Sequence, residues 1–345
     1  MEQQFDERSG VESQQRGEHE HESEQQQRFS SRQDSFFFMS TLFEQITAKE
    51  NLYAAARRAA SGKRFRGNIA KWRFHMEEEI EKLQMELCNG TYSPGGYRVF
   101  RIFDPKERDI SVAPFRDRVV HHAIHDVIEL DIDKKFIFDS YACRRGKGTH
   151  AAVDRAQKFL RATKYCLHGD IKKYFPSLEH CVLKRLLRRY IKDMDVLNVL
   201  DRIIDQAGGN IGVPIGNLTS QFFANVYLHE LDRYVKHELK CRYYLRYMDD
   251  FLVFADDRSY LFDMRLKIKG FLVERLNLIL HESKSQVFKN VNGITFLGFR
   301  LFEKRRRLAS SNVNRVRQRI KGWMLSKQAS KQASKQASKQ ALSPY

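Results

Sequence analysis

The sequence has few cysteines, and they form no recognisable pattern. Five are scattered along 345 residues, at positions 88, 143, 166, 181 and 241, without a C-x-x-C pair. Such a set argues against a disulfide framework and a zinc site, and it favours reduced thiols in the cytoplasm. The N-terminus also lacks the pattern of a signal peptide, and no apolar run approaches the roughly 20 residues that span a bilayer. We therefore expect a cytoplasmic protein with no membrane association.

Positive charge is abundant but unevenly distributed. The formal net charge is +18, yet residues 1–35 contain nine acidic and four basic side chains and carry −5, which leaves +23 on the remainder. A basic body of this size is expected to attract a polyanion, for which nucleic acid is the natural candidate. Composition alone leaves open a basic protein with no such ligand. The chain can also bury a sizeable core, because 42% of its residues are apolar and 25 are Phe.

Both ends of the chain differ in composition from the middle. Residues 1–35 are rich in Gln, Glu, Ser and Arg, and we expect them to be disordered. Residues 326–345 are a low-complexity tail in which Ser-Lys-Gln-Ala occurs four times; it is either a fraying helix that contacts nucleic acid or a neutral product of repeat expansion. Hydrophobic periodicity between them predicts helices at about 36–60, 67–87, 178–191, 219–237 and 312–325, and strands at 97–103, 110–113, 164–170, 241–246 and 251–255.

The most informative stretch is Tyr-Met-Asp-Asp at 247–250. Its two carboxylates stand between two apolar, aromatic-rich runs, so they fall in or beside the connection of a hairpin. Adjacent ionised carboxylates repel each other, and one pKa rises unless a cation lies between them. A hard divalent metal ion such as Mg²⁺ is the usual resolution. A solvated Asp-Asp turn is the alternative for an arbitrary pair.

A third carboxylate, Asp170, ends another apolar run. Alone it is typical of a helix cap or a turn. Paired with Asp249, it would supply the second ligand of a two-metal site, in which ions roughly 3.5–4 Å apart hold the attacking and leaving oxygens of a phosphoryl transfer. Between these aspartates, a glycine-rich loop at 208–221 could approach a ligand closely, or could simply precede a core helix.

In chain order, these parts resemble the catalytic motifs of reverse transcriptases. His168–Phe175 is similar to the first motif, Val213–Gln221 to the second, and Tyr247–Asp250 to the third. The resemblance spans about residues 97–302, and six segments in the right order are a strong signal where one would be only a hypothesis. The other three segments are 116–123, similar to the helix before the fingers–palm segment; 140–150, similar to that segment; and 293–299, similar to the primer-grip hairpin.

The resemblance implies an α+β fold, the right-hand polymerase fold. Its parts would be N-terminal helices and fingers at 36–165, a palm at 166–302 made of an antiparallel sheet backed by helices, and a short helical thumb at 303–325, with fingers and palm interleaved. The segment after the palm carries no second nuclease, integrase or zinc-finger pattern. That argues against a self-mobile intron protein.

The resemblance also assigns roles to single residues. Asp170, Asp249 and the backbone carbonyl of Ile171 would hold two Mg²⁺ ions, with Mn²⁺ as another option, and Asp250 would be a catalytic residue and a weaker or indirect metal ligand. Phe175 would exclude the ribose 2′-hydroxyl, unless it is only a core aromatic. Other expected nucleotide contacts are Lys106, Arg108, Arg116 or Arg118, Ile215, Gly216 and Lys284, the last as proton donor to pyrophosphate; the primer grip would be Phe296, Leu297 and Gly298. For each basic residue, a surface charge with no ligand is the alternative.

The loop at 215–221 most resembles reverse transcriptases of diversity-generating retroelements, because most reverse transcriptases have Gln where this chain has Ile215. This implies cDNA synthesis with errors at template adenines, for targeted replacement of gene sequence. The implied partners are a template RNA and its RNA/cDNA duplex, deoxynucleoside triphosphates and a small basic accessory protein. The alternatives are a retron, abortive-infection or group II intron-type reverse transcriptase and, from another class, an RNA-binding protein with a decayed polymerase fold. The intact aspartates argue against the last.

Overall fold

A four-stranded antiparallel sheet forms the centre of one half of the molecule. The computed structural model describes residues 40–103 and 107–341. The sheet order is β4 (Tyr243–Tyr247), β5 (Asp250–Ala255), β3 (Tyr165–Asp170) and β6 (Gln286–Lys289). All three neighbouring pairs are antiparallel, and β3 pairs with β5 from Tyr165 opposite Ala255 to Asp170 opposite Asp250. The strands predicted at 164–170, 241–246 and 251–255 are therefore confirmed to within two residues at their ends.

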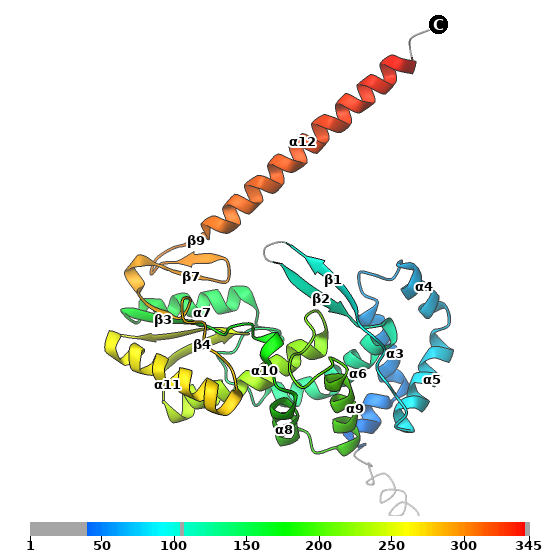
Figure 1. Cartoon of the computed structure of the whole chain (residues 1–345), viewed down its shortest axis with the longest axis horizontal. Coiled ribbons are helices and arrows are strands. Elements are labelled where there is room, and N and C mark those ends of the chain that lie inside the picture. Colours follow the sequence, from blue (N-terminus) through cyan, green and yellow to red (C-terminus); the bar gives the residue numbers. More distant parts are fainter. Residues whose placement is uncertain (1–39, 104–106, 342–345) are drawn as a thin grey trace, which may run out of the picture.

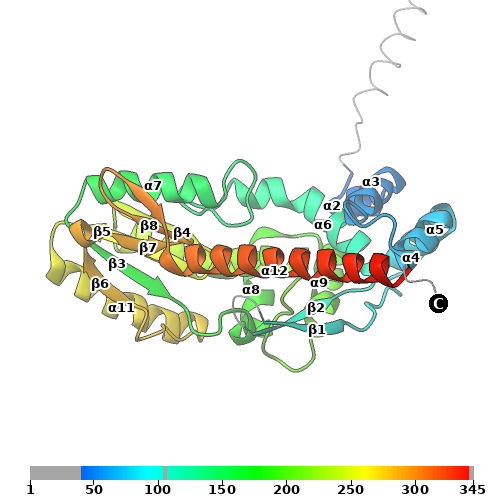
Figure 2. The ribbon, with the colours of Figure 1, turned by 90° about the horizontal axis from the view of Figure 1, so that it is seen from above.

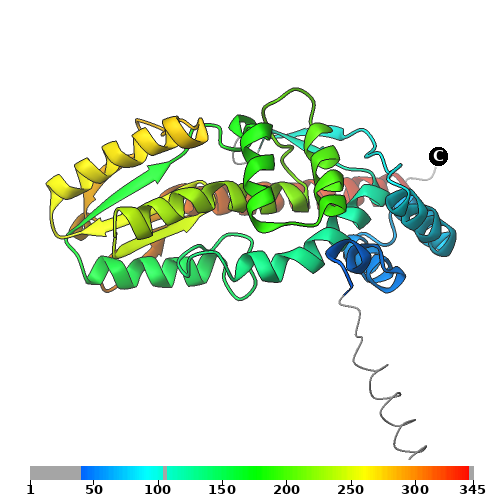
Figure 3. The ribbon, with the colours of Figure 1, turned by 90° about the horizontal axis from the view of Figure 1, so that it is seen from below.

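Both faces of this sheet are covered, as its apolar sequences require. Alternate strand residues point to opposite faces. Leu167 and Val253 pack in one core cluster with helices α10 (Leu218–Arg233) and α11 (Arg258–Leu276), which lie across the face seen in Figure 3. Cys166 and Phe254 pack in a second cluster with helix α7 (Thr149–Arg161) on the other face. Figure 1 shows the sheet between α7 and α11.

A second antiparallel sheet, outside α7, leads to the last helix. Its strands are β7 (Ile294–Phe296), β8 (Phe299–Leu301) and β9 (Arg306–Leu308). No strand was predicted in the basic segment that ends at Arg307; β9 forms at its end because Arg306–Leu308 pairs with β8. Helix α12 (Ser310–Ala341) then rises from the body and runs toward the end that carries α4 and α5 (Figures 1 and 2). The predicted helix at 312–325 is confirmed, and the Ser-Lys-Gln-Ala repeats continue it.

The other half of the molecule is mainly helical. The helices predicted at 36–60 and 67–87 are each divided in two, because Ala48 is extended and the backbone at His75 leaves the helical region; residues 36–39 lie outside the described residues. A hairpin, β1 (Arg98–Ile102) with β2 (Arg108–Val112), projects from this half toward the space below α12 (Figure 1). The helices here are α2 (Leu42–Thr47), α3 (Lys49–Ala59), α4 (Gly67–Phe74), α5 (Met76–Cys88), α6 (Phe115–Asp133), α8 (His180–Tyr190) and α9 (Met194–Asp205).

Three short helical turns complete the chain. The helix predicted at 219–237 is α10 followed by one π-helical turn, η2 (Tyr234–Glu238). A 3₁₀ turn, η1 (Phe175–Ser177), links β3 to α8, and another, η3 (Asn290–Asn292), follows β6. Across the described residues, no helix has the length and apolar character needed to traverse a bilayer.

Candidate active site

The three predicted aspartates meet at one edge of the central sheet. The register of β3 with β5 places Asp170 directly opposite Asp250. Asp249 lies in the two-residue turn between β4 and β5, where Tyr247 pairs with Asp250. Met248, the other turn residue, has a φ of 57°, which is unusual for a residue with a side chain. The hairpin connection predicted around the acidic pair is therefore confirmed, and we call residues 247–250 the aspartate turn.

The residue before Asp170 must be small for the two strands to meet as they do. Gly169 lies opposite Phe251, and a Cβ at this glycine would come within 2.1 Å of Cζ of the Phe251 ring. That ring is fully buried and cannot move aside without disturbing the core. The glycine thus gives room for an aromatic ring directly beneath the aspartates.

The Asp249 carboxyl has a raised pKa. Burial raises the pKa of Asp249 to about 6, and the negative charges of Asp170 and Asp250 add to the rise. The positive charge of Arg108, from the start of β2, opposes it. A carboxylate in this position is stabilised by a nearby cation.

The other two aspartates already contact basic side chains. Lys284 Nζ donates to Asp170 Oδ1 at 2.8 Å. His168 Nε2 lies 2.5 Å from Asp250 Oδ1. Burial acts against a charged His168, but its hydrogen bond to Asp250 and the charges of Asp250 and Asp170 outweigh that effect and raise its pKa. His168 was not assigned a role from the sequence, although its position two residues before Asp170 puts both side chains on the same face of β3.

The donor atoms fit a hard divalent cation, although not as a preformed cage. Among the residues that the structure describes, no group of three or more His, Cys, Asp or Glu side chains is arranged to hold a metal ion. An ammonium group nevertheless already occupies an oxygen of Asp170, and Asp249 is crowded by like charge. Oxygen donors of this kind are those that Mg²⁺ prefers. The backbone beside Ile171 is fixed, because His281 N donates to the Asp170 carbonyl and Lys172 N donates to the Ile279 carbonyl.

The glycine-rich loop packs between the first aspartate segment and the β1–β2 hairpin. Val213 N donates to the Phe175 carbonyl at 3.0 Å, and Ser111 N donates to the Ile215 carbonyl at 2.9 Å. Gly216 has a φ of 116°, and a Cβ there would lie 2.8 Å from Cγ2 of Ile110. The loop therefore joins the Phe175 segment, through Val213, to β2, against which Ile215 and Gly216 lie. Phe175 is half-buried and also packs on the core.

The predicted basic contacts occupy different environments. Arg108 is exposed and acts on Asp249, whereas Lys106 lies outside the described residues. Arg116 pairs with Glu86. The Arg118 guanidinium lies 5.1 Å from the centre of the Phe115 ring, and burial lowers its pKa.

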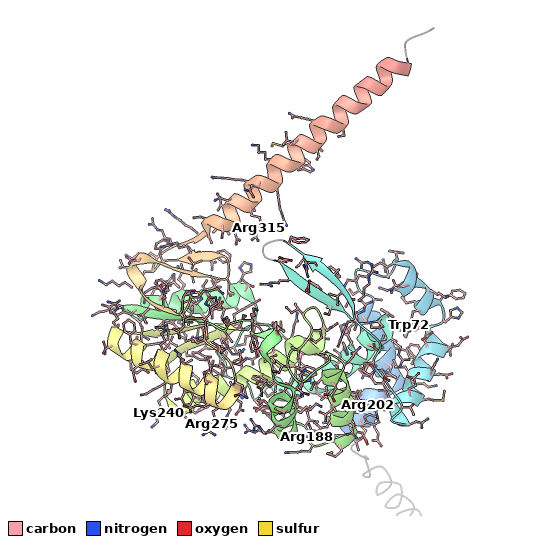
Figure 4. The ribbon with its side chains drawn as sticks, in the orientation of Figure 1. Trp72, Arg188, Arg202, Lys240, Arg275 and Arg315 are labelled. Carbon is pink, nitrogen blue, oxygen red and sulfur yellow. The ribbon has the colours of Figure 1, made fainter. Side chains whose placement is uncertain are left out.

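The predicted primer-grip residues form the turn between β7 and β8. Phe296 is buried, and its ring contacts the His168 ring edge-on at 6.4 Å between centroids. Leu297 and Gly298 both have positive φ, 48° and 82°. The Gly298 carbonyl accepts from Asn312 Nδ2 at 3.1 Å, which joins this turn to the base of α12, where Figure 4 labels Arg315.

A buried ion pair beneath the aspartate turn was missed by sequence reasoning. Arg246 and Asp232 are both fully buried, and Arg246 Nη2 donates to Asp232 Oδ2 at 2.6 Å. The available signal was a charged residue inside the apolar run at 241–246, since charged side chains are almost never fully buried unless they are paired.

Comparison with known proteins agrees with this geometry. The family model "Reverse transcriptase (RNA-dependent DNA polymerase)" matches residues 104–301. The group II intron-encoded protein LtrA of Lactococcus lactis subsp. cremoris is 29% identical over 171 residues, which cover 46% of this chain and 28% of that protein. Protein YkfC of Escherichia coli K12 is 26% identical over 284 residues, which cover 68% of this chain and 74% of that protein. The match therefore spans little more than a quarter of the intron-encoded relative.

Among solved structures, telomerase from Candida albicans in complex with a TWJ fragment of telomeric RNA has a TM-score of 0.49 at 14% identity, covering 63% of this chain and 47% of that one. Apo telomerase from Candida tropicalis also has a TM-score of 0.49 at 14% identity, covering 68% and 53%. The family match and the helix-backed antiparallel sheet confirm the expected right-hand polymerase fold. Because the family model covers more than half of the sequence, the chain belongs to the reverse transcriptase (RNA-dependent DNA polymerase) family.

Proposed function

We propose that this chain copies a template RNA into DNA with Asp170, Asp249 and Asp250 at its catalytic centre. The observation that carries the proposal is the convergence of the three carboxylates from β3 and the aspartate turn, within a sequence that matches the reverse transcriptase family. A half-buried Asp249 with a raised pKa is typical of a carboxylate that binds a cation. The substrates would be deoxynucleoside triphosphates and a primed RNA template.

In the proposed mechanism, Asp170, Asp249 and the carbonyl of Ile171 hold two divalent ions, Mg²⁺ or Mn²⁺. Such ions, when bound, lower the pKa of the primer 3′-hydroxyl and neutralise charge on the transferring phosphoryl group. Asp250 acts indirectly, because His168 already engages it. Lys284, on Asp170, is the donor for the leaving pyrophosphate.

Phe175, Ile215 and Gly216 would form the surface against which the new base pair is placed. The hydrogen bonds from Val213 to Phe175 and from Ser111 to Ile215 support this role, since they fix the loop between the Phe175 segment and β2. Arg108, with the other predicted basic residues Lys106 and Arg118, would attract the triphosphate. In the predicted primer grip of Phe296, Leu297 and Gly298, the turn residues Leu297 and Gly298 would contact the primer end, and the buried Phe296 would support them.

The test is primer extension with purified protein, Mg²⁺ and an RNA template. We expect Asp249→Asn to abolish synthesis while RNA affinity stays nearly unchanged, because the carboxylate is needed for the metal whereas binding comes from distributed positive charge. Asp256→Asn is the matched control, since Asp256 is exposed just after β5, and it should extend primers like the parent. Parent-like extension by the Asp249 variant would refute the two-metal assignment.

We further infer that the enzyme belongs to a diversity-generating retroelement and works in the cytoplasm with a small basic accessory protein. Ile215, in place of the Gln of most reverse transcriptases, supports this subtype, and the five free cysteines support a reducing compartment. We expect weak, unprocessive synthesis from the isolated chain, and long cDNA with errors at adenines only with the partner and the cognate RNA. Processive copying of arbitrary templates by the chain alone would contradict the partner requirement.

A group II intron-type enzyme is the second candidate. It is supported by the matched relative that is named as a group II intron-encoded protein. Sequencing of the cDNA separates the two candidates, because the intron-type reading predicts no excess of errors opposite template adenine.

A further inference from the structure

The guanidinium of Arg246 uses all five of its N–H donors inside the protein. Nε and Nη2 donate to the two oxygens of Asp232 at 2.7 and 2.6 Å. The second hydrogen of Nη2 reaches Ser140 Oγ at 3.2 Å. Nη1 donates to Asn225 Oδ1 at 3.3 Å and to the backbone carbonyl of Met248 at 3.1 Å. The side chain therefore joins the loop before α7, helix α10 and the aspartate turn.

The bond to Met248 ends at the residue that immediately precedes Asp249. Met248 has a φ of 57°, a strained conformation for a residue with a Cβ, which persists only when its surroundings enforce it. The hydrogen bond from Nη1 fixes the carbonyl of this strained residue. The direction of the Asp249 side chain depends on that peptide unit.

We propose that Arg246 is a positioning residue that holds the aspartate turn in its strained conformation, so that Asp249 points to the metal-binding side of the sheet. This inference rests on the proposed two-metal function. Arg246 acts through the backbone, since it contacts Met248 and not the reacting atoms.

The surroundings explain why this residue must be an arginine. Both Arg246 and Asp232 have no solvent exposure, and Tyr244 Oη also donates to Asp232 Oδ1 at 2.7 Å. Only a planar fork can engage both carboxylate oxygens and still donate to a carbonyl on its other side. A lysine has only three donors, in one cone, so at least two of the five hydrogen bonds that Arg246 makes would be lost. Burial opposes the charge on Arg246, but the Asp232 carboxylate outweighs it and raises the pKa of Arg246.

The experiment compares Arg246→Lys with Arg144→Lys. Arg144 is a matched control, because it is also mostly buried, pairs with Asp133 at 2.5 Å and donates to the Ser140 carbonyl at 2.8 Å. None of the bonds described for it reaches the aspartate turn. Both variants are measured for thermal stability, RNA affinity, Mg²⁺ dependence of primer extension, and binding of Mn²⁺ to the protein–primer–template complex by electron paramagnetic resonance.

We expect Arg246→Lys to weaken Mn²⁺ binding and to raise the half-saturating Mg²⁺ concentration by about tenfold, the effect of losing one buried charged hydrogen bond. The KM for the deoxynucleotide should change less than kcat, and excess metal should restore part of the rate. Arg144→Lys should lose stability without a change in metal dependence. Equal metal dependence in the two variants, or parental Mn²⁺ binding by a folded Arg246→Lys protein, would overturn the proposal.

If Arg246→Lys does not fold, Asp232→Asn decides the question. It keeps the shape of the acceptor but weakens the hold on the guanidinium, so a smaller shift in the same direction is expected, and no shift would refute the role. Asp249→Asn separates this inference from the proposed function. An active Asp249→Asn enzyme refutes the two-metal site itself, whereas an inactive one combined with parental metal binding by the Arg246 variant refutes only the positioning role.

Discussion

Single side chains at this site are held by partners that lie far away in the sequence. Asp170 contacts Lys284, in the turn before β6, and Asp250 of β5 contacts His168 of β3. Phe175 and Ile215 are joined to neighbouring segments by their backbone carbonyls. The Phe175 ring also packs on the core, but both side chains are only half-buried, so part of each can contact a ligand.

Phe175→Ala should admit ribonucleotides. The half-buried ring is bulky at the position assigned to the 2′-hydroxyl, and exclusion by bulk is lost when the ring is removed. The measurement is the ratio of kcat/KM for a ribonucleotide and the matching deoxynucleotide. Phe262→Ala is the control, because Phe262 is 42% exposed on α11. If a folded Phe175 variant rejects ribonucleotides as well as the parent does, the selecting group lies elsewhere.

Ile215→Gln should lower the frequency of errors opposite template adenine. An amide must be hydrogen-bonded when buried, and an unmet bond costs roughly 1–3 kcal/mol, which corresponds to about tenfold or more in discrimination. Isoleucine imposes only shape. The cDNA made on one RNA by both proteins is sequenced, with Ile211→Gln as control, because Ile211 is 56% exposed in the same loop. An active Ile215 variant with an unchanged error spectrum would show that Ile215 only packs beneath the loop.

The sequence predicted the residues that meet in the site better than the contacts that hold them. Asp170, Asp249 and Asp250 could be placed together because strand ends and a tight turn have local signatures. The contact of His168 with Asp250 could not be predicted, since it depends on the register of β3 and β5. The burial of Arg246 could not be predicted from periodicity either, because it requires a carboxylate partner on another element.

At the scale of elements, the site depends on the pairing of β3 with β5. This pairing sets Asp170 beside Asp250 and stacks Phe251 over Gly169. The strand positions could be predicted from apolar runs. The helix breaks at Ala48 and His75 could not be predicted in this way, and neither could the continuation of α12 through the repeats. Lys, Gln and Ala tolerate a helix without requiring one, so the composition of the repeats left that element open.

Gly169→Ala should destabilise the fold by about 1–3 kcal/mol, the usual cost of forcing an extra group into a packed core. It should also lower activity more than stability alone explains, because the Phe251 ring must move under the aspartates. The free energy of unfolding is measured by chemical denaturation. Gly270→Ala is the control, and it should instead stabilise the fold. A Cβ there meets only Glu274 Oε1 at 3.9 Å, and alanine favours a helix over glycine by about 1 kcal/mol. Equal stability of both variants would contradict the packing account.

At the scale of the whole molecule, the N-terminal segment and the rest of the chain carry opposite net charge. The first 35 residues carry −5 and the rest carries +23. Figure 4 labels Arg188, Arg202, Lys240 and Arg275 on the side of the body away from α12. Two of these four are already engaged, Arg188 by Asp201 and Arg202 by the Tyr92 carbonyl.

Replacing the nine acidic residues of 1–35 by their amides should strengthen RNA binding at low salt. The change removes negative charge that repels a polyanion, without altering chain length. Affinity is measured at 50 mM and 1 M salt by fluorescence anisotropy, and the gain should vanish at 1 M, where the Debye length is about 3 Å. A gain of the same size at both salt concentrations would show that the effect is not electrostatic.

In the ion pair between Lys284 and Asp170, the protein itself supplies the counterion of a carboxylate in the aspartate cluster. Because the ammonium contacts an oxygen of Asp170, a metal ion held there as proposed would have to displace it, and the carboxylate would have a cationic partner before and after metal binding. We therefore expect chelation to stop synthesis without unfolding the protein. The displaced Lys284 would be able to reach the triphosphate, so metal binding would be coupled to the placement of the proposed proton donor.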